Sequence, residues 1–300
     1  MSADASPGAA APYRLVALDV DGTVLNDSQV VTPALKAVLG ALPRLGVRTV
    51  LCTGRRWRTT HPVIEEMEHA HPVAVCCGGG LVKRADDERT LYSDPMPELL
   101  AREAVRRFRE GGLVPLLLYD RPLSGRELMV SEADRRRARD LPYLQVNRDY
   151  VRWYEGEYPE LDEAPLIAYT MDEGRRVKAV EEEILAEIGS RGLVEGMDQE
   201  RYGATQRALE VHGPATTKWH ALRWLLERWE VRPEEVVAFG DDINDVPMLE
   251  AAGLGFAMGN ALPRVKAAAD EVTASNEEEG VARALRRVFP ALAEEATDVR

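Results

Sequence analysis

Residues 16–23 of this chain read VALDVDGT, an apolar run that leads into two acids and a glycine. This pattern predicts a buried strand followed by a tight turn. Side chains alternate along a strand, so Asp19 and Asp21 point the same way at its carboxyl end, the edge at which open α/β sheets bind ligands. Such a pair can hold a hard cation such as Mg²⁺, or one acid can attack while the other moves a proton. A lone pair of this kind can equally be a polar strand end without chemistry.

The composition is typical of a globular protein with an acidic surface. The 300 residues, 45% apolar and 30% charged, are enough for one large domain or two ordinary ones. The formal net charge of −13 argues against binding to nucleic acid, which requires a basic surface. A phosphorylated substrate would therefore need a local cation.

No apolar run reaches the ~18–20 residues needed to cross a membrane, so we expect no membrane association and a cytoplasmic protein. Residues 1–12 lack the pattern of a secretion signal and are expected to form a flexible tail. Cys52, Cys76 and Cys77 lie in apolar segments, where we expect reduced core residues.

Strands and helices alternate through the first part of the chain, which predicts an α/β fold with a doubly wound parallel sheet. Thr32 and Pro33 form the expected start of the first helix, as N-cap and first helical residue. The predicted strands are 13–18, 47–55 and 72–77, and the predicted helices are 32–45 and 58–69.

Residues 84–203 differ in composition from the segments before them. The segment is too long for a loop, so we predict an inserted α+β domain. Charged and proline-containing segments there alternate with short strand-like pieces at 113–119, 127–130 and 165–171, and 177–188 resembles an amphipathic helix. We therefore expect a discontinuous core of residues 13–83 and 204–290, with a C-terminal tail at 291–300. The later core elements are expected as strands at 208–212, 236–239 and 253–258 and helices at 217–229, 245–252, 263–269 and 281–288.

A second acidic strand end, FGDDIND at residues 239–245, repeats the pattern of the first. It places Asp241, Asp242, Asn244 and Asp245 after an apolar run. If the two strand ends meet, Asp19, Asp21 and Asp241 can assemble a cation site made only of oxygen ligands.

Two further features suit a phosphate group. Thr53 and Gly54 lie in the polar turn that ends the second predicted strand, where a hydroxyl and accessible backbone N–H groups can bind phosphate oxygens. Lys218 lies near the start of a predicted helix and supplies a positive charge. Each element is weak alone, whereas their order and spacing together are specific.

Taken in order, DVDGT, TGR, the helix that carries Lys218, and GDDIND resemble the four motifs of the haloacid dehalogenase (HAD) superfamily of phosphohydrolases. The insertion between the second and third motifs, together with FAMGNA at 256–261 and EEEGVARAL at 277–285, resembles the Cof-like branch with a C2-type cap. The resemblance covers nearly all of residues 15–288 apart from the insertion. It implies a Rossmann-like core and a cap that closes over the site and selects the substrate.

The resemblance implies a Mg²⁺-dependent mechanism with an aspartyl-phosphate intermediate. Asp19 corresponds to the nucleophile and Asp21 to the acid that protonates the leaving alcohol and then, as a base, activates water. Thr53 corresponds to the residue that binds the transferring phosphoryl group, and Lys218 to the one that orients Asp19 and the phosphate.

The remaining site residues follow from the same motifs. Mg²⁺ would be held by the Asp19 carboxylate, the Asp21 backbone carbonyl and Asp241. Asn244, like Gly54, would contact the phosphate or substrate. Asp245 and Asp242 would act through the ligands, with Asp245 pairing with Lys218.

Two positions depart from the family pattern. Gly78-Gly79-Gly80 replaces the usual Asn-Gly-Ala after the third strand, so a side-chain amide is missing there, and Trp219 replaces the glycine that usually follows Lys218. In the insertion, Arg121 and Arg126 are candidate substrate contacts. No catalytic or metal-binding role is expected for the histidines, His61, His69, His71, His212 and His220.

These observations predict a phosphatase that acts on a small phosphorylated metabolite, either a sugar phosphate or a phosphorylated cofactor, as a monomer or homodimer. The alternatives are a phosphomutase that uses the same aspartyl phosphate, and a non-catalytic protein that binds phosphorylated metabolites.

Overall fold

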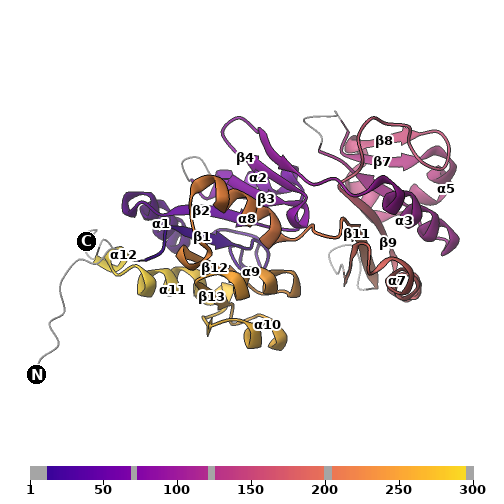
Figure 1. Cartoon of the computed structure of the whole chain (residues 1–300). Helices are drawn as coiled ribbons and strands as arrows, with labels where there is room; N and C mark the ends of the chain where they lie inside the picture. The colour runs from indigo at the N-terminus through magenta and orange to yellow at the C-terminus, as the bar shows by residue number, and fades with distance from the viewer. Residues whose placement is uncertain (1–11, 69–72, 121–125, 199–204, 295–300) are drawn as a thin grey trace, which may run out of the picture. The chain divides into compact units, whose positions relative to one another are not determined.

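The chain passes twice between two structural units (Figure 1). A computed structural model describes residues 12–68, 73–120, 126–198 and 205–294. The first unit comprises Met1–Arg89 and Thr217–Arg300, and the second comprises Thr90–Thr216. Of the residues singled out above, His69, His71 and Arg121 lie outside the described residues, as do residues 1–11 and 295–300 of the expected tails.

The strand predicted from the stretch at residues 16–23 lies inside the first unit's sheet, with a strand on either side. β1 (Leu15–Leu18) is fully buried and pairs in parallel with β2 (Arg48–Cys52) and β12 (Val236–Gly240). The strand order in this unit is β14-β13-β12-β1-β2-β3-β4. The other strands are β3 (Val73–Cys76), β4 (Leu81–Arg84), β13 (Leu254–Ala257) and β14 (Glu271–Val272).

One edge of this sheet departs from the predicted all-parallel pattern, because β4 runs antiparallel to β3. The two strands are joined by a tight turn through η2 (Cys77–Gly79), and a turn this short can only return the chain beside the strand it has just left. Parallel neighbours need a crossover instead. All other strand pairs of this unit given by the structure are parallel.

Helices cover both faces of the sheet, as expected for a doubly wound fold. α1 (Pro33–Ala41) and α2 (Trp57–Glu66) connect strands in one direction along the sheet, whereas α9 (Val246–Ala251) and α10 (Pro263–Ala268) connect them in the other. Since such crossovers are right-handed, the two pairs lie on opposite faces. α8 (Lys218–Trp229) packs against α9, and α11 (Gly280–Val288) packs against α1.

The start of α1 confirms the predicted cap. Thr32 Oγ1 accepts a hydrogen bond from the backbone N–H of Leu35 at 3.3 Å, and Pro33 is the first helical residue. The helix tightens into η1 (Leu42–Leu45) and stops at Gly46, whose φ of 72° is accessible to glycine without strain.

The second unit has its own sheet, with strand order β10-β11-β9-β6-β7-β8. Its strands are mostly antiparallel, and only β7 and β8 pair in parallel among the strand pairs that the structure describes there. α3 (Glu98–Glu110) and α7 (Gly174–Ile188) pack against each other and against β9, around a core that includes the fully buried Phe108. The strands are β6 (Leu116–Leu118), β7 (Leu128–Ser131), β8 (Val151–Tyr154), β9 (Ile167–Glu173), β10 (Leu193–Asp198) and β11 (Gln206–His212).

The return of the chain to the first unit differs from the expected position near residue 204. β11 pairs along its whole length with β9 and β10, so it belongs to the second sheet, and the division falls between Thr216 and Thr217. At the other crossing the division falls after Arg89 instead of after residue 83, so the whole of β4 belongs to the first unit. An alternating strand pattern does not indicate which of two sheets the strand joins. Within the described parts of the chain, no helix is both long and apolar enough to span a membrane.

Candidate active site

The acidic turns after β1 and β12 lie side by side, because these two strands are parallel neighbours. The backbone N–H of Asp19, directly after β1, donates to the carbonyl of Phe239 at 3.0 Å. Carboxylate oxygens of Asp19, Asp241 and Asp245 all lie within 4.8 Å of one another. The predicted meeting of the two strand ends is therefore present.

Lys218 joins two of these carboxylates. It is the first residue of α8, whose N-cap Thr217 accepts a hydrogen bond from the backbone N–H of His220 at 3.1 Å. Its Nζ donates to Oδ1 of Asp19 and to Oδ1 of Asp245, each at 2.7 Å, and its side chain is only 2% exposed. Burial would lower the pKa of Lys218, but the two carboxylates outweigh this and raise it well above its usual value. The lysine is therefore a permanent cation beside Asp19.

Asp245 is fully buried, and hydrogen bonds occupy both of its oxygens. Oδ1 accepts from Lys218, and Oδ2 accepts from the backbone N–H groups of Asp241 and Asp242 at 3.0 and 3.1 Å. Gly240 makes this possible, since a Cβ there would lie 2.4 Å from Cβ of Asp245. Asp245 thus fixes the lysine and the second acidic turn together. Its Oδ2 already accepts two hydrogen bonds, so only Oδ1 keeps a lone pair for a further ligand.

Burial and acidic neighbours raise the pKa of both Asp19 and Asp241 above the usual range of a carboxyl group. Burial, together with Asp245 and Asp242, raises the pKa of Asp241 to about 7. Gly22, with φ of 74°, brings the first turn against it, and a Cβ at Gly22 would lie 2.3 Å from Asp241 Oδ2. Neighbouring carboxylates repel one another when all of them are ionised. A cation bound between them would remove this repulsion, so the cluster is a favourable place for one.

The donor set fits Mg²⁺. Asp19, Asp241 and the backbone carbonyl of Asp21 would supply hard oxygen ligands on two adjacent strand ends, which is the ligand chemistry that Mg²⁺ prefers. The pKa of Asp241 is raised because other carboxylates lie close to it, and the same closeness favours a bound cation.

Thr53 and Gly54 follow β2 at the same edge of the sheet. Thr53 is buried, and its Oγ1 accepts a hydrogen bond from the backbone N–H of Arg55 at 3.0 Å, which leaves its hydroxyl hydrogen free to donate elsewhere. Gly54 is exposed, and a Cβ built there would meet nothing within 4 Å, so a ligand can approach its backbone. This pair meets the steric conditions for contact with phosphate oxygens.

The triple glycine has a structural explanation. Gly79 has φ of 116°, and a Cβ there would lie 2.2 Å from the backbone carbonyl oxygen of Thr217. The turn after β3 therefore packs directly against the N-cap of α8 and helps to seat Lys218. Gly78, at the position of the missing amide, also has a positive φ, of 63°. Trp219 is half-buried in the first turn of α8.

The other predicted residues differ in the contacts that they make within their own units. Asp242 is exposed and caps η7 (Ile243–Asp245) by accepting from the backbone N–H of Ile243 at 2.7 Å. Asn244 Oδ1 is buried and has no hydrogen-bond partner among the described residues. Arg126 belongs to the second unit, where it pairs with Glu163 at 3.4 Å.

Two residues with direct contacts to the predicted site were not predicted. Arg55 donates to both carboxylate oxygens of Asp21, at 2.7 and 2.5 Å. Asn260 donates to the carbonyl of Gly22 at 2.9 Å. Arg55 directly follows Thr53 and Gly54 in the TGR motif, and this adjacency could have revealed it. Asn260 lies in FAMGNA, but nothing local in that motif shows that it returns to the first turn.

The histidines show no metal-ligand spacing in the sequence, and one of them lies beside two glutamates in the structure. His212 Nε2 lies 2.9 Å from Glu210 and 3.7 Å from Glu195 in the second unit. Glu195 and Glu210 are cross-strand partners on β10 and β11, so sequence spacing does not show that they meet.

Comparison with known proteins identifies the family to which this chain belongs. The sequence model of the haloacid dehalogenase-like hydrolases matches residues 16–285, nearly the whole chain. The chain belongs to the haloacid dehalogenase-like hydrolases. The predicted HAD family, its Cof-like branch and the Rossmann-like core with an inserted α+β unit are thereby confirmed.

Relatives within the haloacid dehalogenase-like hydrolases match along most of the chain. Pyridoxal phosphate phosphatase YbhA of Escherichia coli is 29% identical over 278 residues, covering 90% of this chain and 96% of that protein. The 5-amino-6-(5-phospho-D-ribitylamino)uracil phosphatase YitU of Bacillus subtilis is 26% identical and covers 93% and 98%. A crystal structure of a haloacid dehalogenase-like hydrolase from Bacteroides thetaiotaomicron superposes with a TM-score of 0.74 at 26% identity, covering 92% and 100%. These relatives confirm the prediction that the protein is a phosphatase.

Proposed function

We propose that this enzyme is a Mg²⁺-dependent phosphatase that hydrolyses small phosphorylated metabolites through a phosphate ester of Asp19. The observation that carries the proposal is the buried Asp19 carboxylate, held by Lys218 at 2.7 Å and flanked by Asp241. The lysine orients the carboxylate and leaves its second oxygen to react, which is what a carboxylate nucleophile requires.

In the first step, Asp19 attacks phosphorus and the bond to the leaving alcohol breaks. Asp21 gives its proton to the departing oxygen, so the alcohol leaves neutral and Asp19 carries the phosphoryl group. Thr53, the backbone at Gly54 and Lys218 hold the phosphoryl oxygens, and Asn244 contacts phosphate or substrate. Positioning and charge neutralisation dominate phosphoryl transfer, and this arrangement supplies both.

In the second step, Asp21 takes a proton from water, the resulting hydroxide attacks phosphorus, and Asp19 is released with inorganic phosphate. Mg²⁺, held by Asp19, Asp241 and the Asp21 carbonyl, would supply neutralisation of the charge that develops on the phosphoryl oxygens. Asp245 and Asp242 act indirectly, by fixing Lys218 and the turn that carries Asp241.

Two relatives act, by their names, on pyridoxal phosphate and on a phosphoribitylamino-uracil. They favour a compact phosphate monoester, such as a phosphorylated cofactor, its precursor or a sugar phosphate, as the substrate of this enzyme. Metabolites of this kind are cytoplasmic, and we propose the same location for the enzyme.

The test is release of inorganic phosphate from p-nitrophenyl phosphate and from a panel of phosphorylated metabolites. Asp19→Asn removes the nucleophile and should lower turnover by at least a factor of about 10³, because covalent catalysis is lost. EDTA should abolish wild-type activity and added Mg²⁺ should restore it. Asp149→Asn, at an exposed position of the second unit, should leave turnover unchanged.

Retained activity in Asp19→Asn would overturn the nucleophile assignment. A product phosphorylated at a different position, with little free phosphate and a requirement for a bisphosphate, would indicate a phosphomutase. Binding without turnover across the whole panel would indicate a non-catalytic binding protein.

A further inference from the structure

Arg55 forms a two-point contact with Asp21, the residue to which the proposed function gives the proton. Arg55 Nε donates to Asp21 Oδ2 at 2.7 Å, and Nη2 donates to Oδ1 at 2.5 Å. The planar guanidinium matches a carboxylate in two places, which fixes the plane of the carboxylate as well as its position.

The arginine is itself firmly held. Its Nη2 also donates to Gln29 Oε1 at 2.6 Å, and its Nη1 donates to the carbonyl of Thr59 at 3.3 Å. Its own backbone is tied to Thr53 Oγ1 and, through its carbonyl, to the N–H of Cys77 at 2.9 Å. Gln29 keeps φ of 60°, an uncommon conformation for a residue other than glycine, where its amide reaches the guanidinium.

Asp21 has few other constraints. Its side chain is 54% exposed, against 18% for Arg55, and it lies on the turn that contains Gly22. An exposed carboxylate on such a turn would otherwise sample several rotamers. Misplacement by about 1 Å is enough to slow a proton transfer severely.

We propose that Arg55 is a positioning residue that sets the orientation of the Asp21 carboxyl group for proton transfer to the leaving alcohol. The proposal rests on the proposed function. Each carboxylate oxygen has two lone pairs, so an oxygen that accepts from Arg55 keeps one lone pair for the proton. That proton moves to the departing oxygen as the P–O bond breaks, and water replaces it in the second step.

The dependence on the leaving group tests this role. p-Nitrophenyl phosphate releases a stable phenolate that needs little protonation, whereas phenyl phosphate releases a more basic one. Arg55→Met should therefore lower kcat for phenyl phosphate strongly, by a factor on the order of 10², and for p-nitrophenyl phosphate much less. KM should change little for either substrate. Arg55→Lys keeps the cation without the planar fork and should fall between wild type and Arg55→Met.

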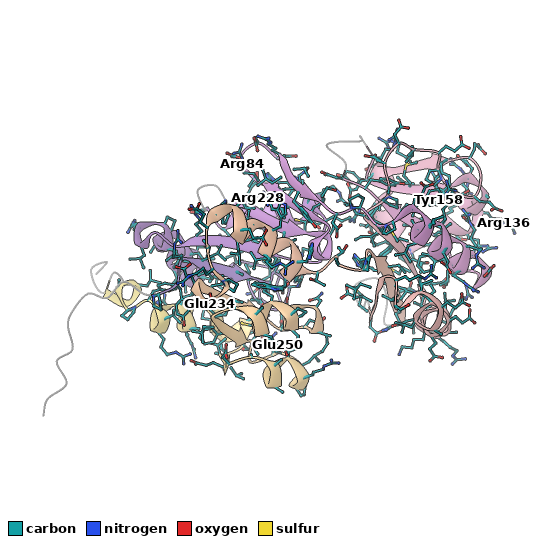
Figure 2. The ribbon with its side chains drawn as sticks, viewed as in Figure 1. Arg84, Arg136, Tyr158, Arg228, Glu234 and Glu250 are labelled. Atoms are coloured by element: carbon teal, nitrogen blue, oxygen red, sulfur yellow. The ribbon has the colours of Figure 1, made fainter. Side chains whose placement is uncertain are left out.

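A double-mutant cycle shows whether Arg55 acts through Asp21. Asp21→Asn alone should show the same leaving-group sensitivity, and adding Arg55→Met to it should cause little further loss. The matched control is Arg84→Met. Arg84 lies on β4 of the first unit (Figure 2) and makes a similar two-point contact, with Asp87 at 3.1 and 2.5 Å. This variant should leave the kinetics of both substrates unchanged.

Equal losses of kcat on both substrates, a rise in KM instead of a fall in kcat, or full additivity with Asp21→Asn would each overturn the role of Arg55. If Asp21→Asn itself shows no leaving-group sensitivity, the proton-donor role of Asp21 fails and the Arg55 proposal fails with it. If only the Arg55 variants lack that sensitivity, the proposed function stands without this residue. Far-UV circular dichroism checks folding, and Arg55→Lys carries the test if Arg55→Met does not fold.

Discussion

Asp245 organises the candidate site although it has no assigned chemical step. It neutralises Lys218 from one side while Asp19 does so from the other, and it also binds two backbone N–H groups of the second acidic turn. A buried cation between two carboxylates is tolerated because each partner compensates the other's loss of water. The orientation of Asp19 therefore depends on a residue that need not touch the substrate.

Asp241 makes the stability of the metal-free protein dependent on pH. Its pKa of about 7 in the folded protein lies above its ordinary value of 3.8, so the folded state binds this proton more tightly than the unfolded state. This contribution to stability is complete below pH 4 or so and is lost as the pH rises towards about 7. In EDTA, the wild-type Tm should therefore fall more steeply from pH 5 to pH 8 than the Tm of Asp241→Asn.

Added Mg²⁺ should stabilise the wild type at pH 8 and stabilise Asp241→Asn much less, since the ion replaces the proton. Parallel Tm profiles for the two proteins would show that the Asp241 proton does not contribute to stability.

At the scale of residues, the acids and the lysine of the site could be predicted from the sequence. The residues that hold the first acidic turn in place could not. Asp19 and Asp241 follow apolar strands, and parallel strands end at one edge of a sheet, so their proximity follows from a general rule. Arg55 and Asn260 contact the first turn through side chains whose direction depends on the conformation of Gln29 and on the packing of a distant loop. No periodicity in the sequence encodes such contacts.

Among the elements, the start of α8 is set by the turn after β3. Gly79 lies so close to the Thr217 carbonyl that the two segments can meet only if residue 79 lacks a side chain. Gly79→Ala should therefore lower the free energy of unfolding by at least about 1–3 kcal/mol, since it combines a forbidden contact with a strained φ. It should also lower kcat, because the displaced helix carries Lys218.

The same substitution elsewhere provides the control. Gly40 lies in α1, and a Cβ at this position would meet nothing within 4 Å, so Gly40→Ala should raise stability by about 0.5–1 kcal/mol and leave kcat unchanged. Chemical denaturation and steady-state kinetics of the two variants measure both effects. A harmless Gly79→Ala would contradict the packing described for this turn.

The elements of the first unit could be predicted more reliably than those of the second. Buried parallel strands form continuous apolar runs, and helices between them begin at recognisable caps such as Thr32 and Thr217. In the second unit, β10 contains Glu195, Gly196 and Asp198, a composition that does not indicate a strand. It is a strand because β11 pairs with it. For this reason the sequence does not predict β10, and it places β11 in the wrong sheet.

At the scale of the whole molecule, the second unit is one uninterrupted segment with a complete sheet and core. Its apolar core draws on α3, α7 and the sheet, with Phe108 fully buried in it. A fragment of residues 90–216 should therefore fold alone and unfold cooperatively on heating. In this fragment, Phe108→Ala should lower stability by about 3–5 kcal/mol.

Circular dichroism during thermal unfolding of the 90–216 fragment, with and without Phe108→Ala, provides the measurement. A broad, non-cooperative transition of the unsubstituted fragment would show that the second unit depends on the first for its structure.

The pairing of Leu15 with Val236 also affects how the protein is made. The second unit leaves the ribosome before β12 does, so this unit can fold on the nascent chain while the first sheet still lacks the pairing of β1 with β12. Until then β1, apolar throughout, can pair only with β2, and its other side is an open sheet edge of the kind that promotes aggregation. We expect nascent chains stalled after the second unit has left the ribosome, but before β12 has done so, to carry a folded second unit and to require chaperone protection for the first.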